Sequence, residues 1–255
     1  MSVKVMIRLG LGGMSIPLAI SLSSALLFSG TAAYPVNGAP GLTANALYAR
    51  TKPVISACVL SKGTTEAATR GYLAKLVRCL NTAWAPVLRS AGFKVRPASL
   101  AVARRMPKCG GYSPDAMVGS AALICERVIR VQLGPDWVRT RDDRAILVAV
   151  GKAYGRYLQE AAGIDAAQRK LRRGDRNEGA EQGRRYGLQS DCLAGVTLKG
   201  VWGKRPGTRW ATPMSGFGRG FEGTVANRRS WLKRGFAAGA PSVCNTWVAT
   251  SKAVA

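Results

Sequence analysis

The stretch from Ile146 to Gln159 constrains the fold of this chain more than any other part of the sequence. It is apolar on nearly every side, and a helix of that kind lies in the middle of a domain rather than on its surface. Two cations, Lys152 and Arg156, interrupt it one helical turn apart, and Gln159 continues the same face. Because a buried charge is costly unless it is paired, we expect this polar stripe to face either a partner or a cavity.

The spacing of Lys152 and Arg156 is the one that a zinc peptidase needs. In the motif His-Glu-x-x-His, two imidazoles one turn apart bind the metal, and the glutamate activates a water molecule. Here the same frame reads Lys152-Ala153-Tyr154-Gly155-Arg156. With Leu147-Val148-Ala149-Val150 before it and Leu158-Gln159 and Gly163-Ile164 after it, the frame resembles the bacterial neutral zinc metallopeptidase family.

A second motif strengthens this resemblance. The segment Leu188-Gln189-Ser190-Asp191-Cys192-Leu193-Ala194-Gly195-Val196 looks like the family's Glu-Leu-Gln-Ala-Asp-Cys-x-Ala-Gly, whose glutamate would be the third zinc ligand. Gly187 stands in the place of that glutamate. Lys152 and Arg156 replace the two histidines, and Ala153 replaces the water-activating glutamate. The resemblance therefore implies a degenerate member, a pseudoenzyme with no catalytic residues and no zinc or other cofactor.

The resemblance also implies a fold and a role for one retained acid. We expect an α+β fold, a mainly helical zincin-like domain over residues 51–255, with a small sheet beside two buried central helices. In related zinc peptidases the aspartate matching Asp191 holds a ligand histidine in place. Since this chain has no histidine, we expect Asp191 to pair with Lys152 or Arg156. The other cation would then bind an anion, so the predicted binding residues are Lys152, Arg156, Gln159 and Asp191.

The net charge of the chain restricts the classes of partner that it can bind. The formal net charge is +25, which favours anionic partners such as nucleic acid, anionic lipid or a phosphate-bearing cell-wall polymer. The basic residues are scattered, and no aromatic-and-basic RNA-recognition signature is present, so nucleic acid is not expected. The complete lack of histidine also excludes histidine-ligated metals and nucleophiles activated by an imidazole base.

The amino terminus predicts export. Lys4 and Arg8 precede an uncharged stretch from Leu9 to Ala33 that ends in small residues, which is the layout of a secretory signal over residues 1–33. Cleavage after Ala33 and an uncleaved membrane anchor are both open. Residues 34–50 are rich in Pro, Gly, Ala and Asn and predict a flexible lead-in. The protein would be secreted or associated with the cell envelope, and would touch a membrane only through its N-terminal segment.

Six cysteines in an exported chain predict three disulfides. They can pair in many ways, and they fall into three groups along the chain. Similar cysteines in exported members of the resembled family imply the pairs Cys58–Cys79, Cys109–Cys125 and Cys192–Cys244. A cysteine-bound zinc is disfavoured because the sequence has no Cys-x-x-Cys pair.

Hydrophobic periodicity predicts further elements around the two motifs. Apolar residues at three-and-four spacing predict a helix over residues 64–91. Residues 93–102 and 122–133 are the best strand candidates, the latter because its end alternates with period two. A last helix is expected over residues 219–238, around Trp231-Leu232.

Three classes of function follow. The leading one is a non-catalytic metallopeptidase-like protein that binds a peptide or an anionic cell-envelope component in the former active-site groove, and that could also regulate an active peptidase relative. The second is a true enzyme, either a zinc peptidase with unusual ligands or another hydrolase. The third is a basic adhesion protein that binds through its overall charge.

Overall fold

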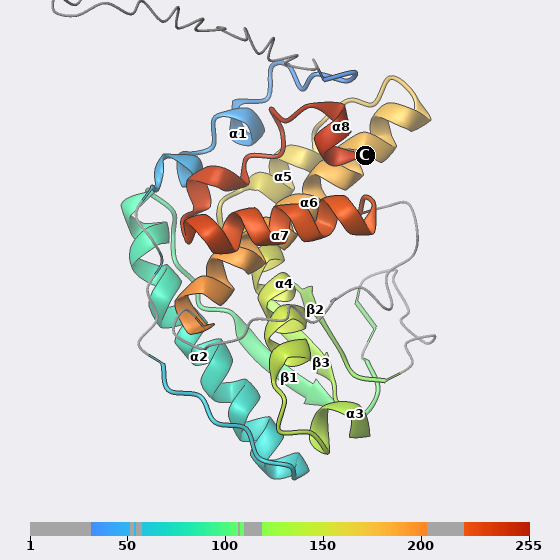
Figure 1. Cartoon of the computed structure of the whole chain (residues 1–255). Helices are drawn as coiled ribbons and strands as arrows, with labels where there is room; N and C mark the ends of the chain where they lie inside the picture. Colours follow the sequence, from blue (N-terminus) through green and yellow to red (C-terminus); the bar gives the residue numbers. More distant parts are fainter. Residues whose placement is uncertain (1–31, 52–53, 55–57, 107, 110–118, 203–221) are drawn as a thin grey trace, which may run out of the picture.

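The computed structural model of the chain describes residues 32–51, 54, 58–106, 108–109, 119–202 and 222–255. This part is an α+β protein, about 58% helical, with a three-stranded sheet (Figure 1). The prediction of a mainly helical α+β fold is therefore confirmed. The signal predicted at residues 1–33 lies almost entirely outside the described residues. Within the described ranges, no helix is long and apolar enough to span a membrane.

In the described part, the three strands follow α2 along the chain and precede α3 and α4. The helices are α1 (Pro40–Thr43), α2 (Glu66–Ser90), α3 (Pro135–Val138), α4 (Arg144–Ala161), α5 (Ile164–Arg169), α6 (Arg176–Trp202), α7 (Val225–Ala238) and α8 (Ser251–Val254), with 3-10 turns η1 (Ala46–Ala49) and η2 (Pro241–Cys244). The strands are β1 (Ser99–Ala103), β2 (Ala121–Cys125) and β3 (Val128–Gln132).

Helix α4 is the buried central helix that the apolar stretch predicts. It packs against the sheet through β2 and β3 and against α6, so its apolar residues find partners around most of its circumference (Figure 1). The contact with α6 is close because Gly155 has no side chain. A Cβ at that position would lie 2.6 Å from the carbonyl oxygen of Ser190, closer than real Cβ atoms approach. The glycine between Lys152 and Arg156 therefore lets the two central helices touch through their backbones.

Helix α6 is the second predicted buried helix, and it is longer than the motif alone indicates. Helix α7 crosses it in Figure 1, and this crossing also depends on glycine. A Cβ on Gly195 would lie 2.0 Å from the carbonyl oxygen of Leu232, and a Cβ on Gly235 would lie 1.9 Å from that of Cys192. The two backbones are in contact at this point, and α6 is held between α4 on one side and α7 on the other.

The sheet has the order β1-β3-β2, with β1 parallel and β2 antiparallel to the central strand β3. The prediction of one strand over residues 122–133 is wrong, because the chain reverses at Glu126 and Arg127 to form a hairpin. Both residues have positive φ, 50° and 63°, as a tight two-residue hairpin turn requires. The period-two alternation in β3 is confirmed, since Ile129 and Val131 are fully buried.

Helix α2 confirms the helix predicted over residues 64–91. The hydroxyl of Thr65 accepts a hydrogen bond from the Ala68 amide and caps the helix N-terminus. Its apolar face packs into the same core as α4, and the phenol of Tyr72 donates a hydrogen bond of 2.8 Å to Asp143, just before α4. This contact fixes the start of α4 against the N-terminal third of α2.

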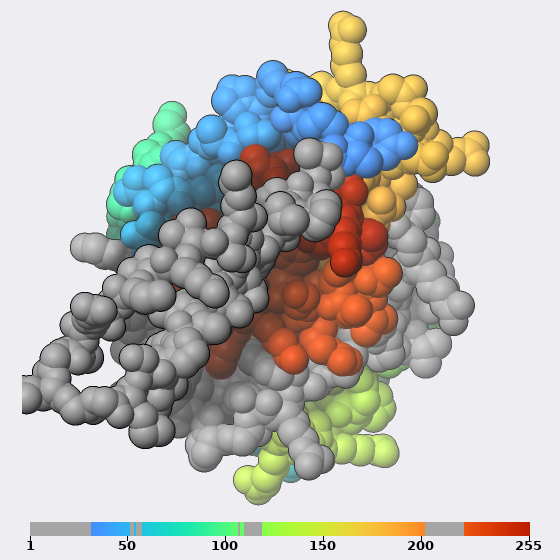
Figure 2. Space-filling model, turned by 45° about the horizontal axis from the view of Figure 1, so that its top comes forward, coloured from blue at the N-terminus to red at the C-terminus, as the bar shows by residue number. Residues whose placement is uncertain are grey.

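Residues 34–50 are not the loose lead-in that their composition predicts. They include α1 and η1, whose Leu42 and Leu47 are fully buried in the core. The Asn45 side chain donates a hydrogen bond of 3.0 Å to the carbonyl oxygen of Ala162, at the end of α4. In Figure 2 the segment lies in blue on the surface, beside the yellow and red parts of the chain. Two leucines are enough to anchor a stretch otherwise composed of turn formers.

All three predicted disulfides are present: Cys58–Cys79, Cys109–Cys125 and Cys192–Cys244. The first ties the segment before α2 to that helix, the second joins β2 to the segment that precedes it, and the third fixes η2 to α6. Disulfides persist in oxidising compartments, so these three favour an extracytoplasmic location.

Candidate functional site

Asp191 forms the ion pair that the sequence predicts. Its Oδ1 atom lies 3.2 Å from Lys152 Nζ, across the contact between α6 and α4. Its Oδ2 atom accepts a hydrogen bond of 3.0 Å from Nε of Arg228 on α7. All three side chains are at least nine-tenths buried. Asp191 therefore links the three helices that meet around α6.

A second carboxylate, which the sequence did not predict, completes the site. Glu222 lies just before α7, and its Oε2 atom is 2.6 Å from Lys152 Nζ. Its Oε1 atom accepts a hydrogen bond of 3.0 Å from Arg156 Nη2, and Arg228 Nη2 lies 3.3 Å from Oε2. Lys152, Arg156, Asp191, Glu222 and Arg228 thus form one ion cluster. With three cations and two carboxylates, the cluster carries one net positive charge.

Gly187 makes room for Glu222. A Cβ at Gly187 would lie 3.1 Å from both Cα and Cβ of Glu222, which is tighter than most real contacts. The chain then turns into α7 through Gly223, whose φ of +87° is open to glycine and rare for other residues. Gly187, at the position where the resembled family carries a ligand glutamate, therefore has no side chain. Glu222, from elsewhere in the chain, fills the space beside it.

Burial decides the electrostatics of the cluster. Burial lowers the pKa of Lys152, and the carboxylates of Asp191 and Glu222 oppose that shift. Burial on its own would raise the pKa of Glu222, but the charges of Lys152 and Arg156 outweigh it and hold the pKa below its usual value. Glu222 is therefore ionised at neutral pH. The cluster holds together because each buried charge lies against one of opposite sign.

The cluster has an inner and an outer part. The side chains of Asp191 and Arg228 are 4% and 5% exposed, whereas those of Glu222 and Arg156 are 15% and 21% exposed. The guanidinium of Arg156 also lies over the ring of Tyr186, 4.2 Å from its centroid. Arg156 and Glu222 are thus the members that a ligand from solvent would meet first.

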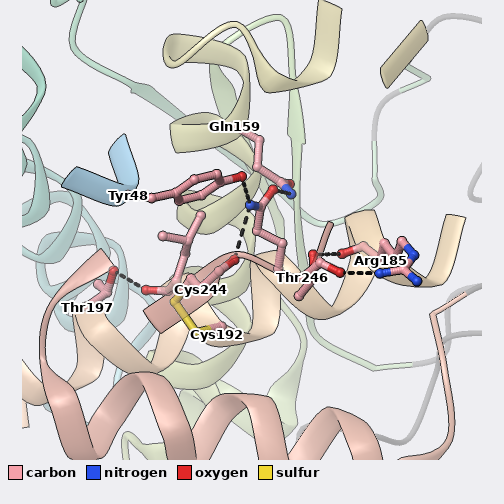
Figure 3. The surroundings of a disulfide bond; sticks show 9 residues. Tyr48, Gln159, Arg185, Cys192, Thr197, Cys244 and Thr246 are labelled. Atoms are coloured by element: carbon pink, nitrogen blue, oxygen red, sulfur yellow. Dashed lines mark hydrogen bonds between the residues drawn. A yellow bond between two sulfur atoms is a disulfide. The ribbon is translucent and has the colours of Figure 1, made fainter. Parts of the chain in front are cut away.

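Gln159 does not belong to the ion cluster, although it lies on the same helix. Its side-chain amide donates hydrogen bonds to the carbonyl oxygen of Tyr186 and to Gln189 Oε1. Figure 3 shows it among the polar groups around the Cys192–Cys244 disulfide. There the Gln189 amide donates to the Tyr48 hydroxyl and to the Cys244 carbonyl oxygen. The stripe predicted on α4 is therefore divided between two sites, and Gln159 joins α4 to α6 instead of facing the cations.

The remaining predicted position, Ala153, is buried in the hydrophobic core and offers no acid or base. Where the resembled family would hold zinc, Lys152 and Arg156 present positive charge that repels a dication. Among the described residues, no three His, Cys, Asp or Glu side chains come together in a way that could hold a metal ion. The residues at this site therefore do not fit zinc.

Comparison with known proteins yields no match to any family model, curated protein or solved structure. The resemblance to the neutral zinc metallopeptidases thus rests on the two motifs and on the cysteines.

Sequence reasoning missed Glu222 and the site role of Arg228. Neither residue stands in a recognisable motif, and the chain brings them to α4 from more than sixty residues away. One feature of the sequence does indicate that a further carboxylate is needed, however. Two cations on a buried helix need about as many carboxylates, and Asp191 alone does not neutralise both Lys152 and Arg156.

Proposed function

We propose that this chain is an exported, non-catalytic relative of the neutral zinc metallopeptidases. It binds a peptide or an anionic cell-envelope component at the place where the family would cut a peptide. The observation that supports this most strongly is the ion cluster. Cations occupy both positions of the metal-binding frame, and two carboxylates hold those cations in place.

The chemistry of peptide hydrolysis supports the non-catalytic part of the proposal. A zinc peptidase needs a metal to polarise the carbonyl and activate water, and a carboxylate to take the proton from that water. In this chain the alanine at position 153 cannot take a proton, and Lys152 and Arg156 do not attract a dication. The same cations suit an anion, because a charge-assisted hydrogen bond is among the stronger polar contacts in proteins.

The proposal predicts that binding depends on Arg156 and not on net charge alone. Binding of an acidic peptide and, separately, of a phosphate-bearing cell-wall polymer is measured by calorimetry on the wild-type protein, R156A and R104A. Arg104 is the matched control, since its side chain is 85% exposed and its loss removes the same charge. For at least one of the two probes, R156A should weaken binding about tenfold or more, because it removes a charged hydrogen bond, while R104A should change it by less than about twofold.

Two outcomes would contradict the proposal. Equal losses in R156A and R104A, with a steep dependence on salt, would point to a basic adhesion protein that binds through its whole charge. Absence of binding to both probes would remove the binding function at this site.

A further inference from the structure

The carboxylate of Glu222 is held by cations at both of its oxygens. Oε2 lies against Lys152 Nζ and Arg228 Nη2, and Oε1 accepts a hydrogen bond from Arg156 Nη2. Lys152 and Arg156 come from α4, and Arg228 comes from α7. Both helices are packed in the core, so the three cations that form this cradle are carried by elements other than the segment of Glu222. Charges converging on two oxygens match the shape of a carboxylate group.

The two acids of the ion cluster differ in how firmly they are fixed. Asp191 lies within α6, which is packed between α4 and α7, and its side chain is 4% exposed. Glu222 lies outside any helix, three residues before the first residue of α7, and is joined to Thr224 by Gly223. Its side chain is 15% exposed. Glu222 can therefore leave the cradle without the disruption of a helix, and Asp191 cannot.

Glu222 does not satisfy the cradle completely. The side chain of Arg228 is 95% buried, since 5% of it is exposed, yet its Nη2 atom has no hydrogen-bond partner. That atom lies 3.3 Å from Glu222 Oε2 without the geometry of a hydrogen bond. A buried donor without a partner is uncommon and costly, and it points to a group that is bound better than Glu222.

We propose that Lys152, Arg156 and Arg228 form a carboxylate-binding site, that Glu222 occupies it in the ligand-free protein, and that the carboxylate of a ligand takes its place. This inference rests on the proposed function and names the chemical group through which the ligand is recognised. A neutral ligand in place of Glu222 would leave three cations beside the single carboxylate of Asp191, so the site selects against it. Glu222 acts as an internal competitor, because the ligand binds only the fraction of molecules in which Glu222 has left.

Chemical rescue tests this proposal in the full chain. The variant E222A removes the internal carboxylate and leaves a space that acetate can fill. At an acetate concentration about five times its dissociation constant, the Tm of E222A should rise by roughly 2–4 °C relative to chloride at equal ionic strength. The wild-type protein and E66A should show no acetate-specific rise. Glu66 is a suitable control because it is an exposed partner of Arg70.

Two further variants and two peptides make the test specific. Adding R156A to E222A should abolish the rescue, because Arg156 contacts one of the two carboxylate oxygens. If E222A does not fold, E222Q serves instead, since its amide keeps the size of the side chain but is neutral, and acetate should displace it. Two peptides distinguish the source of the carboxylate: tri-alanine with a free carboxyl end, and an amidated peptide with one internal glutamate. Binding of either one to E222A, and loss of that binding with R156A, supports the proposal.

Equal Tm shifts with acetate, chloride and phosphate, or a larger shift with phosphate, would overturn the carboxylate assignment. The proposed function can fail separately. If Arg156-dependent binding is found for the wild-type protein but E222A shows no rescue, the further inference fails alone. If E222A is rescued but the wild-type protein binds neither the acidic peptide nor the polymer, the proposed function fails while the carboxylate site stands.

Discussion

Substitution of Gly195 by alanine should lower the free energy of unfolding by about 3 kcal/mol or more, which is large for the addition of a single methyl group. The new Cβ would lie 2.0 Å from the Leu232 carbonyl oxygen and 2.7 Å from the Phe236 amide nitrogen. Both atoms belong to the backbone of α7, so no side chain can rotate away. The two helices would have to separate at their crossing, and denaturant unfolding measures the loss.

Gly71 is the matched control for this substitution. It lies within α2 on an exposed face, and a Cβ there would meet nothing within 4 Å. G71A should therefore stabilise the protein by about 0.5–1 kcal/mol, since alanine loses less backbone entropy than glycine in a helix. If G195A proved as stable as G71A, the backbone contact between α6 and α7 would not exist as described.

Removal of the Asp191 carboxylate should lower the free energy of unfolding by a similarly large amount. D191A removes the carboxylate that pairs with both Lys152 and Arg228 and leaves these cations buried, and breaking a buried pair on one side typically costs about 3–5 kcal/mol. The loss can be followed by urea unfolding at neutral pH. The double variant K152A/D191A should lose less than the sum of the two single variants, because each substitution removes the partner of the other.

An exposed ion pair provides the comparison for D191A. Glu66 pairs with Arg70 one turn away on α2, and the side chains are 43% and 38% exposed. E66A should cost less than about 1 kcal/mol, as surface pairs usually do. A similarly small effect of D191A would mean that the ion cluster is open to water, and the account of a buried cluster would be incorrect.

The central helices could be predicted because their signal is local. The residues between Ile146 and Gln159 are apolar on most sides, and a helix with that pattern needs partners all around it. The structure provides the sheet on one side of α4 and α6 on the other. The disulfides could be inferred by resemblance, and their positions also agree with the helices and strands that they join.

The β-hairpin could not be predicted with the same rules. A tight turn with two positive φ values usually carries Asn-Gly or Asp-Gly, and here it carries Glu126 and Arg127. Without a turn signal, nothing in the sequence between Ala121 and Gln132 marks the point where the chain reverses. The tertiary structure overrides the local preference at this turn: Glu160, near the end of α4, accepts a hydrogen bond from the Arg127 backbone amide.

The ion cluster shows why a site is harder to predict than a helix. Asp191 and Lys152 could be paired in advance, because each lies in a motif and the two helices were expected to meet. Glu222 lies in no motif, so nothing in its local sequence connects it to α4. Its position depends on Gly187 and Gly223, which leave space for it and set its direction. The helical spacing of Gln159 predicts that it faces the cations, but its amide instead donates a hydrogen bond to Gln189.

The measurement that tests the account most directly is the zinc content of the purified wild-type protein after incubation with excess zinc and desalting. The positive charge of Lys152 and Arg156 and the lack of an acid at Ala153 predict close to zero zinc per chain, and no peptidase activity that a chelator removes. If the protein instead retained zinc stoichiometrically, ligands other than Lys152, Arg156 and Gly187 would have to hold the metal. The non-catalytic account would then be wrong, and an active peptidase with unusual ligands would replace it.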